Sequence, residues 1–179
     1  MARSLTIADF IEQIPALRAG EDLLLSGTLF TARDAAHKRL AQLISDKQPL
    51  PIELANAVIY YCGPAPARPG DAVGPCGPTT SARMDPYTPL LLSLGVRATI
   101  GKGKRSTPVT DACRAHQAVY CVTTGGVAAL LSQKVRRSEI IAFADLGPEA
   151  IWRFDVVDFP VTVALDSNGN DIFRPSTKR

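Results

Sequence analysis

Several features that would assign a protein class at once are missing from this 179-residue chain. No apolar run approaches the roughly 18 residues that a membrane-spanning helix needs. A signal peptide is also missing, because the first residues lead into a polar amphipathic stretch and not into an apolar segment. The chain has no basic tail, and its formal charge of +3 is mild, so nucleic acid is not the default partner. We therefore expect a cytoplasmic protein that contacts neither membrane nor nucleic acid.

Metal-binding patterns are absent as well. The four cysteines form no C-x-x-C pair, and the chain has only two histidines to assist them. No acidic pair and no Ser-His-Asp arrangement stands out in the loops. We therefore expect free thiols, and neither a zinc site nor an iron–sulfur cluster bound by this chain alone. The thiols in question are Cys62, Cys76, Cys113 and Cys121.

What remains is the composition of one globular domain. Apolar residues make up 46% of the chain and charged residues 21%, which argues against disorder. A chain of this length buries a core but is too short for two large lobes. We expect a single domain over residues 1–179, with residues 1–20 as an N-terminal extension and residues 174–179 as a disordered tail. The initiating methionine favours a separately made subunit over a piece of a fused enzyme.

Short hydrophobic segments alternate with helix candidates, which predicts a parallel sheet with right-handed crossovers and hence an α/β fold. The expected strands, rich in β-branched and aromatic residues, are 58–62, 96–100 and 119–122. The expected helices are 86–94, with Asp85 as its cap, 109–116, opened by Thr107 and Pro108, and about 126–134. Three further strands without helices between them, which predict a second, antiparallel layer, are 22–30, 152–157 and 161–165.

The first candidate site is the start of a helix after residue 30. Thr31 and Asp34 fit a capping box, which places Arg33 in the first helical turn. A cation is disfavoured beside the partial positive charge there, so Arg33 indicates a bound anion. The alternative is an arginine that is merely solvated. His37, one turn later, would either orient Arg33 or pack in the core.

The second candidate is the turn over residues 74–85, which contains Thr79, Thr80, Ser81 and Arg83 and comes at the end of a long loop rich in glycine and proline over residues 63–77. Ligands of open α/β sheets bind beyond the carboxyl ends of the strands, where this turn should lie. Its three hydroxyls could serve as simple caps. Together with Arg83, they would instead form a cradle for a carboxylate or a phosphate.

The third candidate is the run Ile100-Gly101-Lys102-Gly103-Lys104-Arg105-Ser106-Thr107, between a strand and a helix. It lacks the spacing of a phosphate-binding loop, so we interpret it as a flexible cationic loop. The glycines on both sides of Lys102 allow the backbone to approach a ligand, which favours Lys102 over Lys104 as a contact. The pair Gly125-Gly126 would form a fourth such loop or serve helix packing. Together the loops predict half of a site for a small dianion, with any metal chemistry supplied by another chain.

Several motifs in this order resemble the C-terminal (β) domain of class I, iron–sulfur fumarate hydratases and the β subunit of L-tartrate dehydratase. The resemblance covers residues from about 24 to 173 and implies a swivelling β/β/α fold, with a parallel sheet, an antiparallel sheet and a helical layer. The motifs that carry it are Ser26-Gly27-Thr28, Thr31-Ala-Arg33-Asp34-Ala-Ala-His37-Lys-Arg39, Gly77-Pro-Thr79-Thr80-Ser81-Ala-Arg83-Met84-Asp85, Gly101-Lys102-Gly103 and Asp145-Leu-Gly-Pro-Glu149-Ala-Ile-Trp152.

The resemblance implies a hydro-lyase that reversibly hydrates fumarate to malate. In this family a 4Fe–4S cluster is bound by cysteines of the α domain, so the implied partner is a fumarase α subunit, and this chain would be active only with it. The resemblance thus implies a small dicarboxylate substrate and a homo-oligomer or heterotetramer, and none of the chain's own cysteines would bind iron. L-Tartrate dehydratase and mesaconate hydratase β subunits remain alternatives, since loop chemistry does not distinguish one methyl or hydroxyl group.

The resemblance also assigns roles to the candidate residues. Arg33, Arg83 and Lys102, together with Thr80, would bind the substrate carboxylates, and Thr79 would be the base that takes the C3 proton. Asp34, His37 and Ser81 would support them from behind. Thr80 and Ser81 remain alternatives for the base. A rival of another class is a non-catalytic anion- or nucleotide-binding module, in which Lys102, Lys104 and Arg105 grip phosphates.

Overall fold

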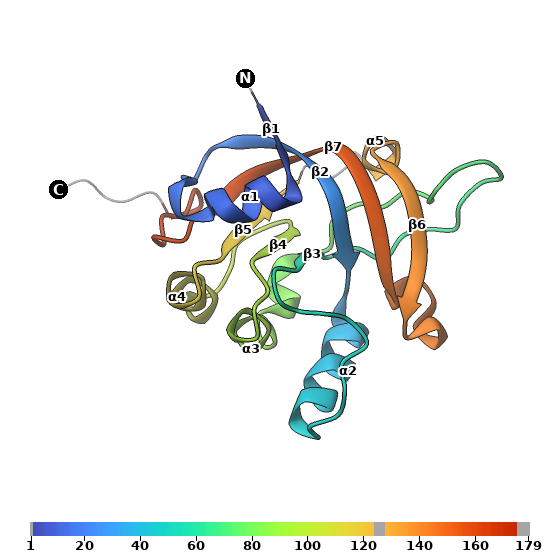
Figure 1. The fold of residues 1–179 in the computed structure, drawn as a ribbon, viewed down its shortest axis with the longest axis horizontal. Coiled ribbons are helices and arrows are strands. Elements are labelled where there is room, and N and C mark those ends of the chain that lie inside the picture. Colours follow the sequence, from blue (N-terminus) through green and yellow to red (C-terminus); the bar gives the residue numbers. More distant parts are fainter. Residues whose placement is uncertain (1, 124–127, 175–179) are drawn as a thin grey trace.

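Figure 1 shows the computed structural model of the chain, which describes residues 2–123 and 128–174. The described residues form a mixed α/β fold of seven strands, five α-helices and three short 3-10 helices. In chain order these elements are β1 (Arg3–Thr6), α1 (Ile7–Gln13), η1 (Ile14–Ala16), β2 (Asp22–Thr31), α2 (Asp34–Ser45), β3 (Val58–Tyr60), η2 (Ser81–Met84), α3 (Thr88–Ser93), β4 (Ala98–Gly101), α4 (Thr107–Ala115), β5 (Val119–Val122), α5 (Ala128–Ser132), β6 (Val135–Ala142), η3 (Ala144–Glu149) and β7 (Ile151–Leu165).

All seven strands belong to one continuous sheet, in the order β1-β2-β3-β4-β5-β7-β6. The first five pair in parallel, and β7 pairs antiparallel with β2, β5 and β6. Because β7 pairs with both β2 and β5, the strands β2, β3, β4, β5 and β7 form a closed ring of paired strands. Ser26 and Thr28 on β2 strengthen its contact with β7, since Ser26 Oγ accepts from the amide of Asp158 and Thr28 donates to Asp155.

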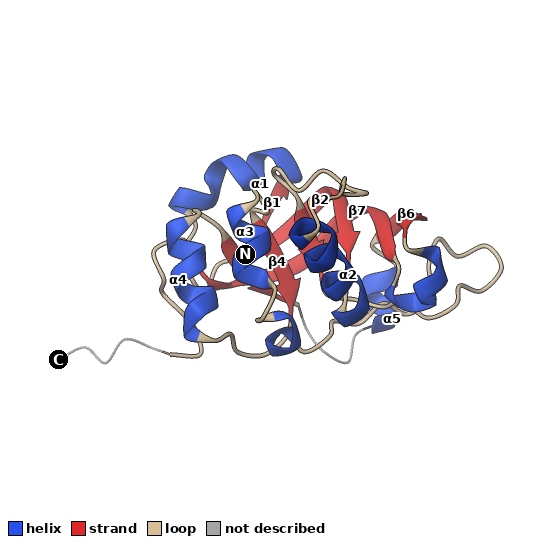
Figure 2. Ribbon diagram, turned by 90° about the horizontal axis from the view of Figure 1, so that it is seen from below, coloured by secondary structure: helices blue, strands red, loops and turns tan. Residues whose placement is uncertain are grey.

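The parallel strands β3, β4 and β5 are almost entirely buried on both faces, as expected for strands that are covered on both sides. Successive side chains of a strand point to opposite faces, and here Tyr60 and Ile100 join one core with Phe10 of α1. Ile59 and Tyr120 join the other core. The helices α2, α3 and α4 cover this second face, as Figures 1 and 2 show. The two cores together fix the carboxyl ends of the parallel strands on a rigid frame.

The structure confirms the alternation of strands and helices and corrects several details. The expected strands at 152–157 and 161–165 form the single strand β7, and the expected helix at 126–134 is observed as α5, with its first two residues outside the described ranges. The edge strands β1 and β6 were not expected. Residues 3–16, placed in the expected N-terminal extension, form β1, α1 and η1, of which β1 pairs with β2. Most of the expected tail, 175–179, lies outside the described residues.

Both expected side-chain caps are wrong. Helix α2 begins at Asp34 with Arg33 as its N-cap and no capping side chain, whereas Thr31 accepts a hydrogen bond from the backbone amide of Trp152 on β7. Helix α3 has Tyr87 as its N-cap, and Asp85 is engaged elsewhere. In each case a partner distant in the sequence takes the side chain that local spacing assigned to a cap.

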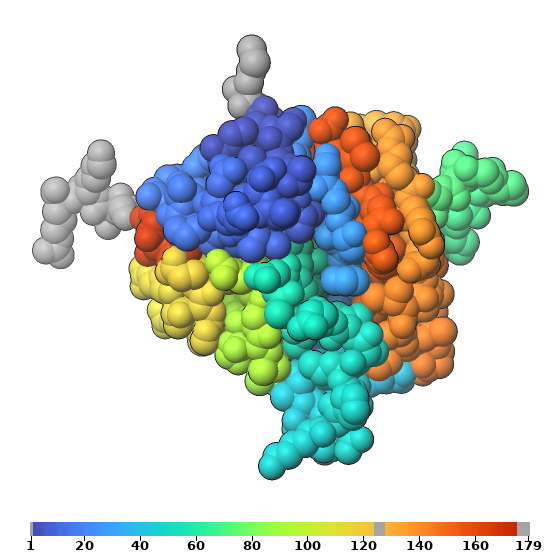
Figure 3. All heavy atoms as spheres, viewed as in Figure 1, coloured from blue at the N-terminus to red at the C-terminus, as the bar shows by residue number. Residues whose placement is uncertain are grey.

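The long loop between β3 and η2 projects from the body of the molecule, as Figure 3 shows at the right of the view. Its two arms run side by side, because the amide of Ala65 donates to the carbonyl of Pro75 and the amide of Thr79 donates to the carbonyl of Tyr61. The base of the loop therefore delivers the Thr79 turn back to the end of β3. None of the helices in the described ranges has the length and apolar character needed to cross a membrane.

Candidate functional site

The three candidate loops meet at one edge of the sheet. Arg33 follows β2, the turn containing Thr79 follows β3 through its loop, and Lys102 follows β4. These strands are adjacent and parallel, so their carboxyl ends share a rim, which is where ligands of α/β sheets bind. Two backbone contacts join the loops directly: the amide of Ser81 donates to the carbonyl of Lys102 over 2.9 Å, and Thr80 pairs with Lys102 as an isolated parallel bridge.

Asp34 connects the two arginines of the site. Its Oδ1 accepts a 2.8 Å hydrogen bond from Nε of Arg83, and its Oδ2 lies 3.8 Å from Nη2 of Arg33. Arg83 is 54% exposed and Arg33 26% exposed, so both guanidinium groups remain accessible at the rim. The structure thus brings Arg33 and Arg83 together around the carboxylate of Asp34.

Glu149, at the end of η3, supplies the negative charge at the start of α2. Its Oε1 lies 3.4 Å from the amide of Ala35 as a hydrogen-bond acceptor and 3.9 Å from Nε of Arg33. The chain's own carboxylate therefore occupies the helix start where the sequence indicated a bound anion. Arg33 Nε is buried and makes no hydrogen bond in the described structure, since its 3.9 Å contact with Glu149 is longer than a hydrogen bond.

Two further features position Glu149 and Arg33: an ion pair between Arg39 and Asp145, and the absence of a side chain at Gly63. Arg39 on α2 grips Asp145 of η3 through two parallel 2.8 Å bonds, which fixes the η3 segment against the helix. Gly63 leaves space for Arg33, because a Cβ there would lie 3.0 Å from Arg33 Cδ and 3.2 Å from Nη1. The segment containing Asp145 and Glu149 was singled out only as part of a family motif, and its spacing gave no sign of these contacts.

The three hydroxyl residues of the turn differ in exposure. Thr79 is half-buried and Thr80 is exposed, with no capping hydrogen bond from its side chain. Ser81 is fully buried, and its Oγ lies 2.9 Å from the hydroxyl of Tyr120. Ser81 is therefore committed to the interior, while Thr79 and Thr80 remain at the rim.

Lys102 and His37 occupy opposite environments. Lys102 is exposed, and the described residues include no ion-pair partner for it. His37 is fully buried, and burial lowers its pKa to about 4. Its Nδ1 lies 2.8 Å from the backbone carbonyl of Arg33, so the neutral ring donates to that carbonyl. His37 thus supports the backbone at Arg33, and its buried Nε2 makes no hydrogen bond in the described structure.

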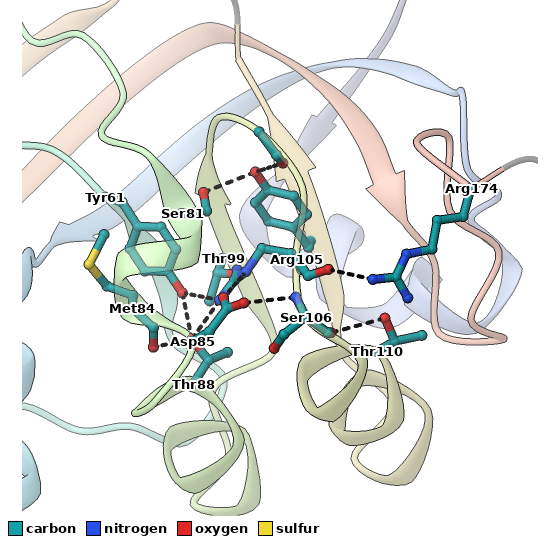
Figure 4. A network of polar contacts seen from close by, with 12 residues as sticks. Tyr61, Ser81, Met84, Asp85, Thr88, Thr99, Arg105, Ser106, Thr110 and Arg174 are labelled. Carbon is teal, nitrogen blue, oxygen red and sulfur yellow. Dashed lines mark hydrogen bonds and ion pairs between the residues drawn. The ribbon is translucent and has the colours of Figure 1, made fainter.

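A buried cluster behind the rim was missed by sequence reasoning (Figure 4). Arg105 is only 3% exposed and its Nε donates to Asp85 over 2.6 Å. The other oxygen of Asp85 accepts from the amide of Ser106, the N-cap of α4. Arg105 therefore cannot grip a phosphate as the rival hypothesis required, and Asp85 serves the following helix α4 in place of α3.

The four cysteines are free and buried. The pKa of Cys62 is raised mainly by a hydrogen bond with the Cys76 thiol and secondly by burial. Burial also raises the pKa of Cys113 to about 12. Iron–sulfur clusters need several converging thiolates, and no three His, Cys, Asp or Glu side chains in residues 2–123 and 128–174 are grouped for a metal ion. The described side chains do not fit such a cluster. The Gly125-Gly126 pair lies outside the described residues.

Comparison with known proteins places these features in context. The family described as Fumarase C-terminus matches residues 3–176. Fumarate hydratase 2 of Leishmania major is 40% identical over 164 residues, which are 90% of this chain and 29% of that protein. The anaerobic class I fumarate hydratase of Escherichia coli is 40% identical over 93% of this chain and 31% of its own length. The L(+)-tartrate dehydratase subunit beta of Escherichia coli is 32% identical over 99% of this chain and 90% of its own length. The chain thus spans less than a third of the fumarate hydratases and nearly all of the separate β subunit.

Proposed function

Because the chain belongs to the fumarase C-terminus family, we propose that it is the β-type part of a class I fumarate hydratase, a hydro-lyase that interconverts fumarate and malate. The observation that carries the proposal is the joining of three cationic loops at one rim. The turn of Thr79 and Arg83 is bonded to the loop of Lys102 and, through Asp34, to the helix start at Arg33.

The roles proposed for the cationic side chains follow from the charge of the substrate. A dicarboxylate carries two negative groups, and arginine binds each carboxylate in a bidentate geometry while lysine adds a compact charge. Arg33, Arg83 and Lys102, with Thr80 beside them, are therefore assigned to the two carboxylates. Their accessible guanidinium and ammonium groups support this assignment.

We assign the transfer of the C3 proton to the hydroxyl of Thr79. A threonine hydroxyl is a weak base unless its alkoxide is stabilised, and the positive charge of the nearby cations at the rim provides that stabilisation. Thr79 is favoured over Ser81 because Ser81 is buried and bonded to Tyr120. Thr80, which is more exposed, is the remaining alternative.

The rest of the enzyme is assigned to a partner. The family resemblance implies a 4Fe–4S cluster, and we place it on a fumarase α subunit, since the described side chains of this chain do not fit one. The near-complete coverage of a protein named as a β subunit supports a two-chain enzyme. In the swivelling β/β/α arrangement, the antiparallel ladders around β7, the parallel strands and the helices α2 to α4 would form the three layers.

Co-expression with such an α subunit tests the proposal. The complex should hydrate fumarate, and the loss of fumarate's ultraviolet absorbance measures the rate. Thr79→Ala should lower kcat by about 10²- to 10⁴-fold, the usual contribution of a general base. Arg83→Ala should raise KM for fumarate. Arg3→Ala is the matched control, because Arg3 is 50% exposed, forms one ion pair and lies on β1 at the start of the parallel strands.

Three outcomes would contradict the proposal in different ways. Full activity of the Thr79→Ala, Arg83→Ala double variant would refute the site assignment. Turnover of L-tartrate without turnover of fumarate would favour the tartrate dehydratase reaction, which the coverage of its β subunit makes the second candidate. Calorimetric binding of ATP to the chain, without any response to malate, would favour a non-catalytic module.

A further inference from the structure

One cation at the carboxyl end of the sheet is buried, and it lies in the same loop as Lys102. Arg105 is 3% exposed, and its guanidinium carries a charge that is costly to remove from water unless it is paired and hydrogen-bonded. Asp85 provides the pairing charge through the 2.6 Å contact with Nε, and is itself only 12% exposed. A buried ion pair often adds little to the free energy of unfolding, so stability alone does not account for the Arg105–Asp85 pair.

The remaining nitrogens of Arg105 bond to three other elements, as Figure 4 shows. Nη2 donates to Oγ1 of Thr88 on α3 over 2.6 Å and to the hydroxyl of Tyr61, after β3, over 3.3 Å. Nη1 donates to Oγ1 of Thr99 on β4 over 3.1 Å. Every bond therefore joins the Lys102 loop to a segment that borders the Thr79 turn or to the strand from which the loop emerges.

The aromatic ring of Tyr120 completes the connection. The guanidinium carbon of Arg105 lies 4.8 Å from the centre of this ring, in cation–π contact. The Tyr120 hydroxyl is 2.9 Å from Ser81 Oγ and 2.8 Å from the carbonyl oxygen of Gly103. Because a carbonyl only accepts, Tyr120 donates to Gly103 and Ser81 donates to Tyr120. One phenol thus links the Thr79–Arg83 turn with the residue after Lys102.

We propose that Arg105 is a positioning residue that sets the Thr79–Arg83 turn at a fixed separation from Lys102. The inference rests on the proposed function for its catalytic consequence, because these two loops hold the assigned base and three of the four residues assigned to the substrate carboxylates. Arg105 touches no substrate in this proposal. Arginine is required because its planar fork serves several acceptors at once and stacks on aromatic rings, whereas lysine presents one compact ammonium group.

Amide hydrogen exchange of the chain tests the positioning role without any activity. In Arg105→Lys, which keeps the charge, the amide of Ser81 should exchange about tenfold faster or more, because its bond to the Lys102 carbonyl is no longer held. Amides of β2 and β7 should keep their protection. Arg97→Lys is the control, because Arg97 precedes β4 at the opposite end of that strand. Unchanged exchange at Ser81, or an equal acceleration throughout the sheet, would overturn the inference.

A second variant decides the matter if Arg105→Lys does not fold. Tyr120→Phe keeps the ring against Arg105 and removes only the hydroxyl that links Ser81 with Gly103, so it should also accelerate exchange at Ser81. Unchanged protection of Ser81 in this variant would refute the connection.

Kinetics of the complex with the α subunit provide the functional readout. A shift of about 1 Å in a reacting group can cost about 10²-fold in rate, so Arg105→Lys should lower kcat at least tenfold while KM for fumarate changes less. An unchanged kcat alongside faster exchange at Ser81 would refute the catalytic consequence and leave the structural link. A wild-type complex that hydrates no fumarate would refute the proposed function, and the exchange experiment would still decide the role of Arg105.

Discussion

Gly101, the last residue of β4, lies against Ser81 of the Thr79–Arg83 turn, and we expect Gly101→Ala to disrupt this packing. A Cβ at this position would overlap Oγ of Ser81 and would lie 2.9 Å from Cδ2 of Tyr61. Ser81 has no room to retreat, because it is fully buried and is bonded through its amide to Lys102 and through its hydroxyl to Tyr120. The added methyl group must therefore displace the turn that carries Thr79.

The expected cost follows from two contributions. Overpacking a buried site costs about 1–3 kcal/mol, and each buried hydrogen bond lost costs about 1 kcal/mol. The free energy of unfolding should therefore fall by about 2–5 kcal/mol, which corresponds to a decrease in Tm of roughly 5–15 °C for a chain of this size. Urea unfolding followed by circular dichroism measures the change.

A double-mutant cycle identifies the cause. Ser81→Ala alone should cost about 1 kcal/mol through loss of its bond to Tyr120. If the overlap with Oγ is the source of strain, Gly101→Ala combined with Ser81→Ala should cost clearly less than the sum of the two single changes. The relief should be partial, since the contact with Tyr61 remains. Additivity within about 0.5 kcal/mol, as found for independent sites, would refute the reasoning.

Two other predictions concern buried polar groups near the site. Burial lowers the pKa of His37 from 6.5 to about 4, so between these values the unfolded chain binds a proton that the folded chain does not. The free energy of unfolding should therefore rise by about 3 kcal/mol from pH 4 to pH 6.5 on account of His37. Urea titrations across this range should show a smaller rise in His37→Asn, and equal slopes would contradict the assignment. Tyr60→Phe should cost about 1–3 kcal/mol, because the Tyr60 hydroxyl donates a buried hydrogen bond to the carbonyl of Cys76. A change in urea midpoint equivalent to less than about 0.5 kcal/mol would show that this carbonyl is satisfied in another way.

The elements that sequence reasoning identified are those with strong local signals. The strands β3, β4 and β5 are short runs of β-branched and aromatic residues buried on both faces. By contrast, β6 was missed because it is a partly exposed edge strand that includes Arg136, Arg137 and Glu139, so its pattern resembles a solvated segment. The strand β1 has only four residues and lies at the other edge.

In the candidate site, too, sequence reasoning found the residues with local signals and missed those that depend on contacts between distant residues. The loops of Arg33, Arg83 and Lys102 could be found because parallel strands must end at a common rim, and the structure joins them there. The roles of Asp85 and Arg105 could not be found, since they depend on a contact across 20 residues. In a run of glycines and cations, composition gives no indication of which cation turns inward.

The structure also explains how two arginines can share one rim without strong repulsion. Asp34 lies between them, but it makes a short hydrogen bond only with Arg83, whereas its contact with Arg33 is 3.8 Å long. Glu149 is similarly distant from Arg33, at 3.9 Å. Arg33 is thus neutralised by two carboxylates while most of its donors stay uncommitted, and partly exposed ion pairs of this kind contribute little stability. Under the proposed function, an incoming carboxylate would replace weak contacts at Arg33, while Arg83 would keep its bond to Asp34 and its orientation. The helix start at Arg33 is thus neutralised by the chain's own carboxylates, and under the proposed function it would still have donors for a substrate dianion.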